Sequence, residues 1–406
     1  MTETKQANRR QQHITIVSET FPPEINGVAN TLRYLCQGLM QRGHRVTVIR
    51  PRQQHERKGD FASAGSALFT REHLVTGLPL PGYADLRFGI ARINHLKKLL
   101  TTDRPDAIYV ATQGPLGVAA TFAARRIGVP VSSGFHTNFH SYSRYYGVGV
   151  LERLLCLYGR WFHNRTAITL VPTRKMQQTT RAMGIPITGL WSRGVDCHRF
   201  TPHKRDNALR ESWGLQTNDR AILYVGRLAP EKNLRMAVAC FERIRGLHPQ
   251  ARFILVGDGP LRHQLAERHP DYVFCGTQRG DDLARHFASG DLFLFPSKTD
   301  TFGNVVLEAM ASGLGVVSFD DAAAAEHIRN GENGMKVPLD RDEAYVDSAL
   351  RLADQPTLLN RIRTQARLDA LEQSWNSQIE QFEHLVLNQT AKAGYHALNK
   401  QSVSLL

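Results

Sequence analysis

The sequence predicts an α/β protein built from two doubly wound parallel-sheet domains. Short runs rich in β-branched and aromatic residues alternate with helical patterns, and this alternation restarts near residue 221. The chain of 406 residues is also too long for one ordinary hydrophobic core. Ligands of open α/β sheets bind outside the carboxyl ends of the strands. We therefore expect the two domains to face a cleft, with the chemistry on strand-end loops.

The first domain is expected over residues 13–195. It begins with a strand at 13–18, after which an apolar stripe with helical spacing runs to Gly43. Further strands are expected at 45–49, 107–111, 129–135 and 167–172. This half of the chain is therefore expected to form a doubly wound domain of its own.

The second domain is expected over residues 215–370. The polar, irregular stretch RGVDCHRFTPHKRDN indicates that the link between the domains lies in 190–215. Strands are then expected at 221–226, 252–257, 272–276, 291–296 and 315–319. Residues 371–390 include an amphipathic segment, 374–389, which we expect to form a terminal helix that packs back on the first domain.

Composition excludes several classes of protein. Arg125 and Arg126 interrupt the best apolar run, so no membrane-spanning segment is expected, and the polar first dozen residues do not resemble a secretory signal. The five cysteines show no CxxC spacing, which favours reduced thiols in the cytoplasm over a disulfide or zinc framework. We therefore expect a cytoplasmic protein without a resident metal.

The net charge of +14 is placed unevenly along the chain. Residues 1–190 carry 25 Lys and Arg against 10 Asp and Glu, whereas the remainder is nearly balanced. The basic half is expected to face an anionic partner, either nucleic acid or an acidic membrane surface, unless it is only a solvated basic face. One candidate for a membrane contact is 87–100, where residues from Phe88 to Leu100 could form an apolar side next to Lys97 and Lys98. The alternative is an ordinary helix that packs on the sheet of the first domain.

The segment ETFPPEINGVANT joins the first strand to the first helix. Gly27 lies where that helix starts, so the backbone can approach a ligand, and the free amides of the first turn favour an anion. The alternative is an ordinary strand–loop–helix glycine. The pattern is not GxGxxG, which makes a dinucleotide a less fitting ligand.

A second candidate loop, YVGRLAPEKN, follows the strand at 221–226. Arg227 and Lys232 flank a turn that leads into a helix, and an arginine fork, an ammonium and a helix N-terminus together suit a diphosphate. The alternative is two solvated cations on a surface loop, which their position at a strand's carboxyl end argues against.

The stretch SKTDTFGNVVLEAMASG places two carboxylates around a strand-to-helix turn. Asp300 precedes the turn, and Glu308 lies in the first turns of the helix. Carboxylates are acceptors only and suit the vicinal hydroxyl groups of sugars, while the backbone amides of the turn can hold polar oxygens or a phosphate. Helix-capping acids are the alternative. The amides belong to Phe302, Gly303, Asn304 and Val305.

The stretch SSGFHTNFHSYSRYYGVG follows the strand at 129–135. His136 comes directly after that strand and precedes a loop rich in aromatic and hydroxyl groups. A lone histidine is usually structural, but the strand end and neighbours such as Asn138, Tyr142 and Tyr145 favour a role in binding or catalysis.

Together these segments resemble the family-four retaining glycosyltransferases of GT-B fold, over roughly residues 13–390. Its most specific motif is the Glu-x7-Glu pattern, present here as Asp300-x7-Glu308. GRLAPEKN resembles the family's phosphate loop and NGV its N-terminal glycine loop. FHTNFxxYxxxYG looks like the branch with GDP-mannose-dependent α-mannosyltransferases, bacterial glycolipid synthases and plant sulfoquinovosyl-diacylglycerol synthases.

The resemblance implies a role for each motif. Arg227 and Lys232 would bind the diphosphate of a nucleoside-diphosphate sugar, Glu308 its ribose and Asp300 its sugar. His136 would lie beside the reacting face of the sugar, and the amides near Gly27 would stabilise the leaving group. The first acid is Asp where the family has Glu, so the identity of the donor stays open.

The resemblance also implies transfer of a hexose of mannose or glucose type with retention of configuration. By this resemblance the reaction would require neither a cofactor nor a metal, because cationic side chains would stabilise the leaving diphosphate. The resemblance implies that residues 215–370 bind the nucleotide sugar and that residues 13–195 meet the acceptor, with Asn138, Tyr142 and Tyr145 on the acceptor side. The expected acceptor is a lipid or glycan, reached from the inner face of an anionic membrane. Two alternatives stay open: a nucleotide-sugar epimerase on the same scaffold, and a basic nucleic-acid-binding protein, although no RNA-binding motif is present.

Overall fold

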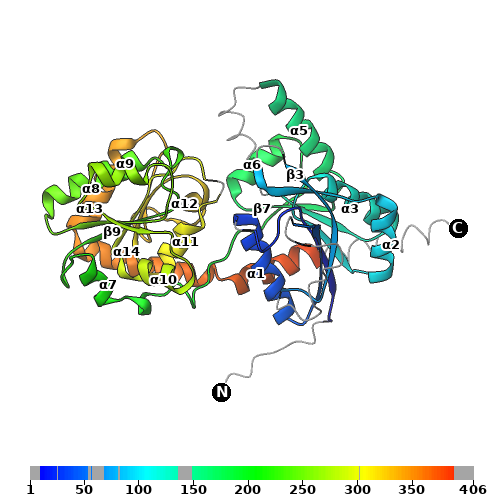
Figure 1. The fold of residues 1–406 in the computed structure, drawn as a ribbon, viewed down its shortest axis with the longest axis horizontal. Coiled ribbons are helices and arrows are strands. Elements are labelled where there is room, and N and C mark those ends of the chain that lie inside the picture. Colours follow the sequence, from blue (N-terminus) through cyan, green and yellow to red (C-terminus); the bar gives the residue numbers. More distant parts are fainter. Residues whose placement is uncertain are drawn as a thin grey trace, which may run out of the picture. The chain divides into compact units, whose positions relative to one another are not determined.

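The computed structural model describes residues 10–24, 26–53, 56, 68–80, 83–135, 149–300 and 302–387. The chain divides into two compact units (Figure 1). The N-terminal unit comprises the residues up to Ser192 together with those from Gln378 onward, and the C-terminal unit comprises Arg193–Ser377. Each unit is built on its own sheet with helices around it, as the alternating sequence pattern predicts.

The sheet of the N-terminal unit has the order β4-β3-β2-β1-β5-β6-β7-β8 among the described residues. All neighbouring strands are parallel except β3 and β4, which form an antiparallel pair at one edge. The strands are β1 (His13–Val17), β2 (Arg45–Pro51), β3 (Arg71–Leu80), β4 (Tyr83–Ile90), β5 (Ala107–Val110), β6 (Val131–Gly134), β7 (Ile168–Val171) and β8 (Thr188–Leu190).

Helices connect these strands where apolar residues recur with helical spacing. The helices with described bounds are α1 (Gly27–Gln41), α2 (Ile93–Asp103), α3 (Pro115–Arg126), α5 (Gly149–His163) and α6 (Arg174–Ala182). The first of these begins where it does because the Asn26 side chain accepts hydrogen bonds from the amides of Val28 and Ala29. It ends before Gly43, whose φ of 87° a side chain would disfavour.

A final helix over 375–387 packs on the N-terminal unit from residue 378 onward. The ring of Phe382 lies 5.1 Å from those of Tyr109 and Trp191, centroid to centroid. Ile379 packs so closely on Gly38 that a Cβ atom at the glycine would lie 1.8 Å from the isoleucine Cδ1. This contact explains a glycine in the middle of α1, where helix propensity disfavours it.

The C-terminal unit contains a sheet of order β11-β10-β9-β12-β13-β14 among the described residues. Its strands are all parallel. They are β9 (Ala221–Val225), β10 (Arg252–Val256), β11 (Val273–Gly276), β12 (Leu292–Phe295), β13 (Gly315–Phe319) and β14 (Met335–Val337). The order reverses between β9 and β12, the kind of switch point at which doubly wound sheets bind ligands.

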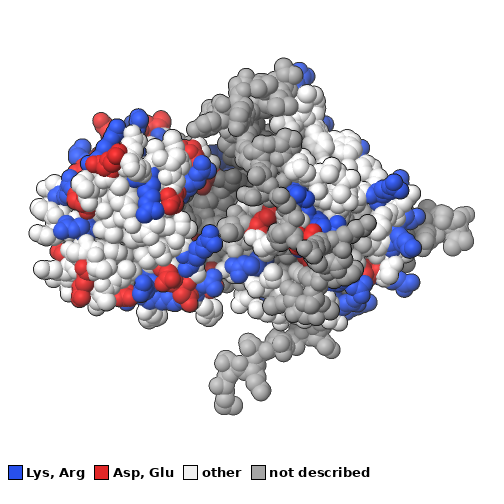
Figure 2. All heavy atoms as spheres, in the orientation of Figure 1, with Lys and Arg blue, Asp and Glu red and all other residues white. Residues whose placement is uncertain are grey.

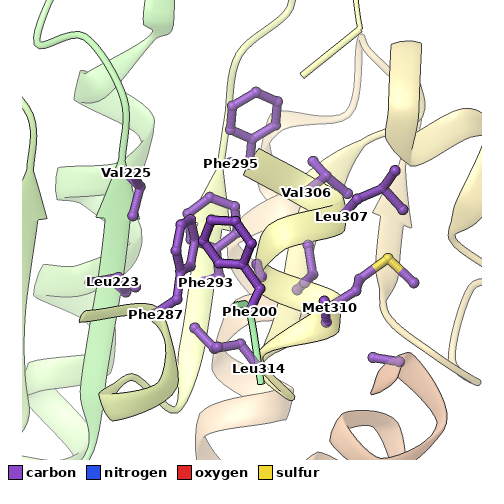
Figure 3. Packing of buried hydrophobic residues seen from close by; sticks show 14 of the residues in the cluster. Phe200, Leu223, Val225, Phe287, Phe293, Phe295, Val306, Leu307, Met310 and Leu314 are labelled. Atoms are coloured by element: carbon purple, nitrogen blue, oxygen red, sulfur yellow. The ribbon is translucent and has the colours of Figure 1, made fainter. Parts of the chain in front are cut away.

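Both faces of this sheet are covered by helices. The helical segments are η1 (Pro202–Lys204), α7 (Asn207–Ser212), η2 (Pro230–Lys232), α8 (Leu234–Leu247), α9 (Arg262–Arg268), α10 (Gly280–Ser289), α11 (Asn304–Ala311), α12 (Ala322–His327), α13 (Asp342–Asp354) and α14 (Pro356–Glu372). Alternate strand residues enter different cores: Leu223 and Val225 pack with α10 and α11 (Figure 3), and Ile222 and Tyr224 pack with α8 and α13.

The interpretation of residues 87–100 as a membrane contact is wrong, and the alternative of a helix packed on the sheet is confirmed for α2. Residues 87–100 do not form one amphipathic contact segment, because Phe88 and Ile90 belong to β4 and α2 begins only at Ile93. Leu96 and Leu100, expected on an exposed apolar side, are fully buried in the core of the N-terminal unit. The helical pattern was real, but its apolar face packs on the sheet. In the part of the chain that is described, no helix has the length and apolar character needed to span a membrane.

Candidate functional site

Three loops meet at the carboxyl end of the C-terminal sheet. The Gly226 amide, after β9, donates to the Val256 carbonyl of β10 over 2.9 Å, and the Leu228 amide donates to Asp258 over 2.9 Å. A Cβ atom at Gly257 would lie 2.0 Å from the Gly226 carbonyl oxygen, and the residue has a φ of 141°. Glycine is therefore required at this position for the loops after β9 and β10 to approach each other.

Lys232 and Asp300 come together at this end of the sheet, although 68 residues separate them in the chain. The Lys232 Nζ donates to Asp300 Oδ1 over 2.7 Å, and each side chain is about one-fifth exposed, at 21% and 19%. A half-buried ion pair at a strand-end loop leaves two ammonium protons and one carboxylate oxygen for a ligand.

Further hydrogen bonds hold the loops after β9 and β12 in register. The side-chain amide of Asn233 donates to the Pro296 carbonyl over 3.2 Å, and the Thr299 hydroxyl donates to the Glu231 carbonyl over 3.1 Å. Asn233 has a φ of 55°, in the left-handed region that asparagine tolerates, and it lets the chain turn from η2 into α8. The ion pair is thus positioned by backbone contacts on both sides.

Arg227 lies in the same loop but points its head group into solvent. Its side chain is 66% exposed and lies 3.7 Å from Glu231, one helical turn away. The backbone carbonyl of Arg227 accepts a hydrogen bond of 3.0 Å from the buried Tyr224 hydroxyl, which fixes the loop and leaves the guanidinium to move. The geometry therefore gives Lys232 a fixed position and Arg227 an adjustable one.

The turn from β12 into α11 presents a helix N-terminus next to this pair. Phe302 is buried, and Gly303, with a φ of 78°, caps the helix without a side-chain hydrogen bond to it among the described residues. Asp300 Oδ2 and Asn304 Oδ1 are buried atoms without a hydrogen-bond partner in the described part of the chain. Buried oxygens left unsatisfied at a helix N-terminus indicate that a ligand supplies the missing partners.

Glu308 lies in the middle of α11, and its side chain is partly buried. Burial raises the pKa of this carboxyl to about 7, and the attraction of Arg199 offsets only part of the effect. Near neutral pH the group is therefore poised between a neutral acid, which can donate a hydrogen bond, and a carboxylate, which only accepts.

Of the other predicted site residues, the structure describes Gly27 and Val305. Gly27 begins α1 as expected, but the prediction of free amides after it is wrong for Val28 and Ala29, which donate to the Asn26 side chain over 3.1 and 2.8 Å. The side-chain amide of Asn26 also donates to the Thr20 hydroxyl over 2.6 Å and so holds the preceding loop. Val305 lies in the first turn of α11, as expected. His136, Asn138, Tyr142 and Tyr145 lie outside the described residues, and their predicted roles stay predictions.

A polar cluster at the carboxyl end of the N-terminal sheet was not anticipated from the sequence. The Glu19 carboxylate accepts hydrogen bonds from the amides of Gly114 and Leu116, at 3.2 and 3.0 Å, where α3 begins. Burial raises the pKa of Glu19. A Cβ atom at Gly114 would lie 2.2 Å from the Glu19 Oε1, so the glycine makes room for the carboxylate.

Gln113 joins this cluster through a buried histidine. His163 Nε2 lies 2.7 Å from Gln113 Oε1, and its Nδ1 lies 2.9 Å from the Ser133 hydroxyl. Burial lowers the pKa of His163 to about 3, so the imidazole is neutral and donates one proton to the glutamine. The Gln113 amide is thereby oriented. The signal available in the sequence was TQGPLG, directly after the expected strand at 107–111.

Charge also distinguishes the two units. In Figure 2, blue and red atoms are interspersed over the C-terminal unit, whereas the visible described surface of the N-terminal unit is mainly white and blue. Across the described ranges, no group of three or more His, Cys, Asp and Glu side chains could hold a metal ion.

Both halves of the chain match families of glycosyltransferases. Residues 25–199 match the family described as Glycosyltransferase Family 4, and residues 219–355 match that described as Glycosyl transferases group 1. A GDP-mannose-dependent alpha-mannosyltransferase of Mycobacterium tuberculosis is 32% identical to the chain over 366 residues, which cover 89% of the chain and 93% of the relative.

Two further comparisons extend the similarity. An alpha-monoglucosyldiacylglycerol synthase of Acholeplasma laidlawii is 23% identical, with 87% of the chain and 92% of that protein covered. The crystal structure of Anabaena HepE in complex with UDP superposes with a TM-score of 0.70 at 19% identity, covering 92% of the chain and 99% of that protein. The predicted GT-B fold class is confirmed.

Proposed function

This chain is a glycosyltransferase of family 4, and we propose that it transfers mannose from GDP-mannose to a lipid acceptor, with retention of the anomeric configuration. The choice of mannose rests on 32% identity to a GDP-mannose-dependent alpha-mannosyltransferase over 89% of the chain. The alternatives of an epimerase and a nucleic-acid-binding protein find no support in the comparisons, and we expect no nucleic-acid binding.

The observation that carries the mechanism is the Lys232–Asp300 pair next to the N-terminus of α11. One ammonium proton of Lys232 is bound to Asp300 Oδ1, and the other two are free to donate to oxygens of the donor diphosphate. Negative charge that develops on the leaving diphosphate is stabilised by this ammonium, by Arg227 as its flexible side chain closes in, and by the amides of α11.

Asp300 is proposed to bind the donor sugar through its second oxygen. That oxygen, Oδ2, is buried and has no partner among the described residues, so a sugar hydroxyl would satisfy it. Because Oδ1 is held by Lys232, the sugar and the diphosphate are positioned by one connected pair of side chains. The shorter aspartate then places the sugar hydroxyl closer to the helix N-terminus than a glutamate would.

Glu308 is proposed to accept hydrogen bonds from the ribose hydroxyls, and His136 to lie beside the reacting face of the sugar. Retention without a carboxylate nucleophile requires the acceptor to attack on the face that the diphosphate leaves, so that a phosphate oxygen takes the acceptor's proton. Asn138, Tyr142 and Tyr145 are proposed to face the acceptor. The Gln113 amide, oriented by His163, is a further candidate on that side.

We further propose that the reaction needs no metal and takes place at the cytoplasmic face of a membrane. Lys232 and Arg227 supply the positive charge that a divalent cation would otherwise bring to the diphosphate. The lipid acceptor is supported by the similarity to an alpha-monoglucosyldiacylglycerol synthase and by the basic excess of residues 1–190.

The test uses the purified protein with GDP-mannose, UDP-glucose or ADP-glucose, each with a bacterial lipid extract and with EDTA present. Mannose is expected to enter the lipid fraction from GDP-mannose only, at a rate that EDTA does not change. Transfer from UDP-glucose in preference would overturn the donor, and dependence on added Mg²⁺ would overturn the metal-free mechanism. Sugar conversion without any acceptor would favour the epimerase.

A further inference from the structure

Helix α5 exposes a continuous apolar stripe. Its four large exposed side chains are Leu154, Leu157, Tyr158 and Trp161, with exposed fractions of 58%, 53%, 37% and 37%. Their spacing of three, one and three residues places all of them on one side of the helix. Large apolar groups gathered on one exposed face indicate an interaction surface, whereas scattered ones would not.

The stripe is not required for the fold of the N-terminal unit. Other sides of α5 supply Phe162 and His163, which are buried in the N-terminal unit. On the exposed side the Tyr158 and Trp161 rings stack at 5.9 Å, and the Trp161 ring lies 6.0 Å from that of Phe122 on α3. The stripe is therefore a preformed surface on a helix that its buried residues already hold in place.

Arginines surround this surface. The guanidinium of Arg165 lies 4.3 Å from the centre of the Trp161 ring, and Arg125 at the end of α3 donates to the Arg165 carbonyl over 3.4 Å. The sequences of α3 and α5 contain a single acid, Glu152. The basic residues along the two helices and their ends are Arg125, Arg126, Arg153, Arg160 and Arg165. Over α5, Figure 2 shows mainly white atoms with blue at the margin.

The helix also lies at the edge of the sheet where an acceptor would arrive. The Tyr158 hydroxyl donates to the backbone carbonyl of Gln113, the residue that follows β5. Through His163 the same helix contacts the Gln113 side chain. A surface that binds α5 is therefore brought next to the carboxyl ends of the N-terminal strands.

We propose that α5 is a membrane-docking helix that inserts its apolar stripe into the interface of an anionic lipid bilayer. Leu154 and Leu157 enter the acyl boundary, and Tyr158 and Trp161 lie at the level of the head groups. The flanking arginines bind lipid phosphates, each adding electrostatic attraction that salt weakens. An anionic bilayer suits this surface because it offers apolar depth and dense negative charge together. The benefit to catalysis rests on the proposed lipid acceptor, but docking itself is measured without any substrate.

Trp161 provides a direct readout. Of the four tryptophans, Trp191, Trp213 and Trp375 are buried and only Trp161 is exposed. Added to the full-length protein, vesicles containing phosphatidylglycerol are expected to shift tryptophan emission to the blue, and lipids brominated on the acyl chain to quench it. Trp161→Phe keeps the apolar ring and is expected to abolish both signals while the protein still sediments with the vesicles. Quenching that persists in Trp161→Phe would overturn the assignment.

Matched double variants test the helix itself. Leu154→Gln/Leu157→Gln is expected to weaken sedimentation with anionic vesicles by at least roughly tenfold, since two half-exposed leucines lose their membrane contact. Leu368→Gln/Leu371→Gln on α14, with exposed fractions of 52% and 43%, is the control and is expected to bind as the parent does. Lys97→Glu/Lys98→Glu on α2 is expected to act only through charge, with a smaller loss that salt removes.

Circular dichroism and donor hydrolysis by the variants establish that they are folded and active. Docking through α5 is overturned if the Leu154/Leu157 variant sediments like the parent, or if the α14 control loses binding equally. It is also overturned if phosphatidylcholine vesicles bind as well as anionic ones. Sedimentation without transfer to lipid would instead contradict the proposed acceptor and leave the docking helix standing.

Discussion

In the C-terminal unit the candidate site comes from two short motifs, whereas the polar edge of the N-terminal unit is assembled from four separate segments. Lys232 and Asp300 lie in the loops that follow β9 and β12, and each motif can be recognised in the sequence. Glu19, Gln113, Ser133 and His163 lie on different segments and meet only in the folded unit. The residues of the proposed donor site can thus be recognised from local motifs, whereas those of the proposed acceptor side become apparent only from long-range packing. The predictions below test that difference, from the largest effect to the smallest.

The largest effect is expected for Lys232→Ala. The substitution leaves Asp300 without its partner and removes a positive charge next to the diphosphate. The transition state should lose about 2–4 kcal/mol of stabilisation, which lowers kcat/KM roughly 30- to 1000-fold. Steady-state kinetics with GDP-mannose measures this loss. Lys298→Ala is the matched control. Lys298 lies in the same loop as Asp300 and forms an ion pair of 2.6 Å with Asp342, but it is not a site residue. Equal losses in the two variants would remove Lys232 from the donor site.

Gly257→Ala should be the next most damaging change. The new Cβ atom would lie 2.0 Å from the Gly226 carbonyl and force apart the loops after β9 and β10, at a cost of about 3 kcal/mol in the free energy of unfolding. Gly331→Ala is the control: its φ of 79° is also positive, but nothing lies within 4 Å. Chemical denaturation should separate the variants by the cost of the clash, and donor affinity should fall only in Gly257→Ala. Similar midpoints would argue that φ alone matters.

The pH dependence of Glu308 should come next in size. Its folded pKa of about 7 exceeds the model-compound value of 4.5, so the folded state holds a proton that the unfolded state has released. Stability is therefore expected to fall as pH rises from about 4.5 to about 7 and to be level above. Donor affinity should rise over the upper part of that range, as the carboxyl becomes a stronger acceptor.

Glu308→Gln provides the comparison, because it removes the titrating group and keeps the shape. In this variant the part of the pH dependence that comes from Glu308 should disappear, both from the stability measured by thermal unfolding and from the GDP affinity measured by isothermal titration. A parental protein whose GDP affinity does not change with pH would contradict the role of Glu308 in ribose binding.

A smaller and more selective effect is expected for Asp300→Asn. The transition state for transfer from GDP-mannose should lose about 1–3 kcal/mol of stabilisation, because the buried Oδ2 atom is replaced by a weaker hydrogen-bonding group. The affinity for bare GDP should change less. Comparing GDP and GDP-mannose in binding and kinetics checks this separation. Equal losses for both ligands would mean that Asp300 contacts the diphosphate and not the sugar.

The smallest effect should come from Gln113→Ala, at the carboxyl end of the N-terminal sheet, where we propose that the acceptor binds. Loss of one oriented hydrogen-bonding group is expected to raise KM for the acceptor by about 1 kcal/mol, or roughly fivefold, with KM for GDP-mannose unchanged. Acceptor titrations at saturating donor measure it. A change in the donor constant instead would sink the division between the two edges.

The sequence by itself determined the parts of this protein that depend on neighbouring residues. The alternation of strands and helices, the switch to a second series near β9, and the loops that carry Arg227, Lys232, Asp300 and Glu308 all follow from local periodicity and turn chemistry. The strand predictions of both units agree with the structure to within a few residues, since β-branched runs bounded by turns have few alternatives. The antiparallel pair of β3 and β4 was missed.

Only the tertiary structure decided which groups meet and which faces stay exposed. Lys232 and Asp300 are 68 residues apart, and Glu19 and Gly114 are 95 apart, distances over which a local pattern says nothing about contact. Helices α2 and α5 both have amphipathic sequences, yet the apolar residues Leu96 and Leu100 are buried while Leu154 and Leu157 are exposed. An amphipathic pattern specifies an apolar face, but burial of that face depends on what packs against it, and that is decided by segments far away in the chain.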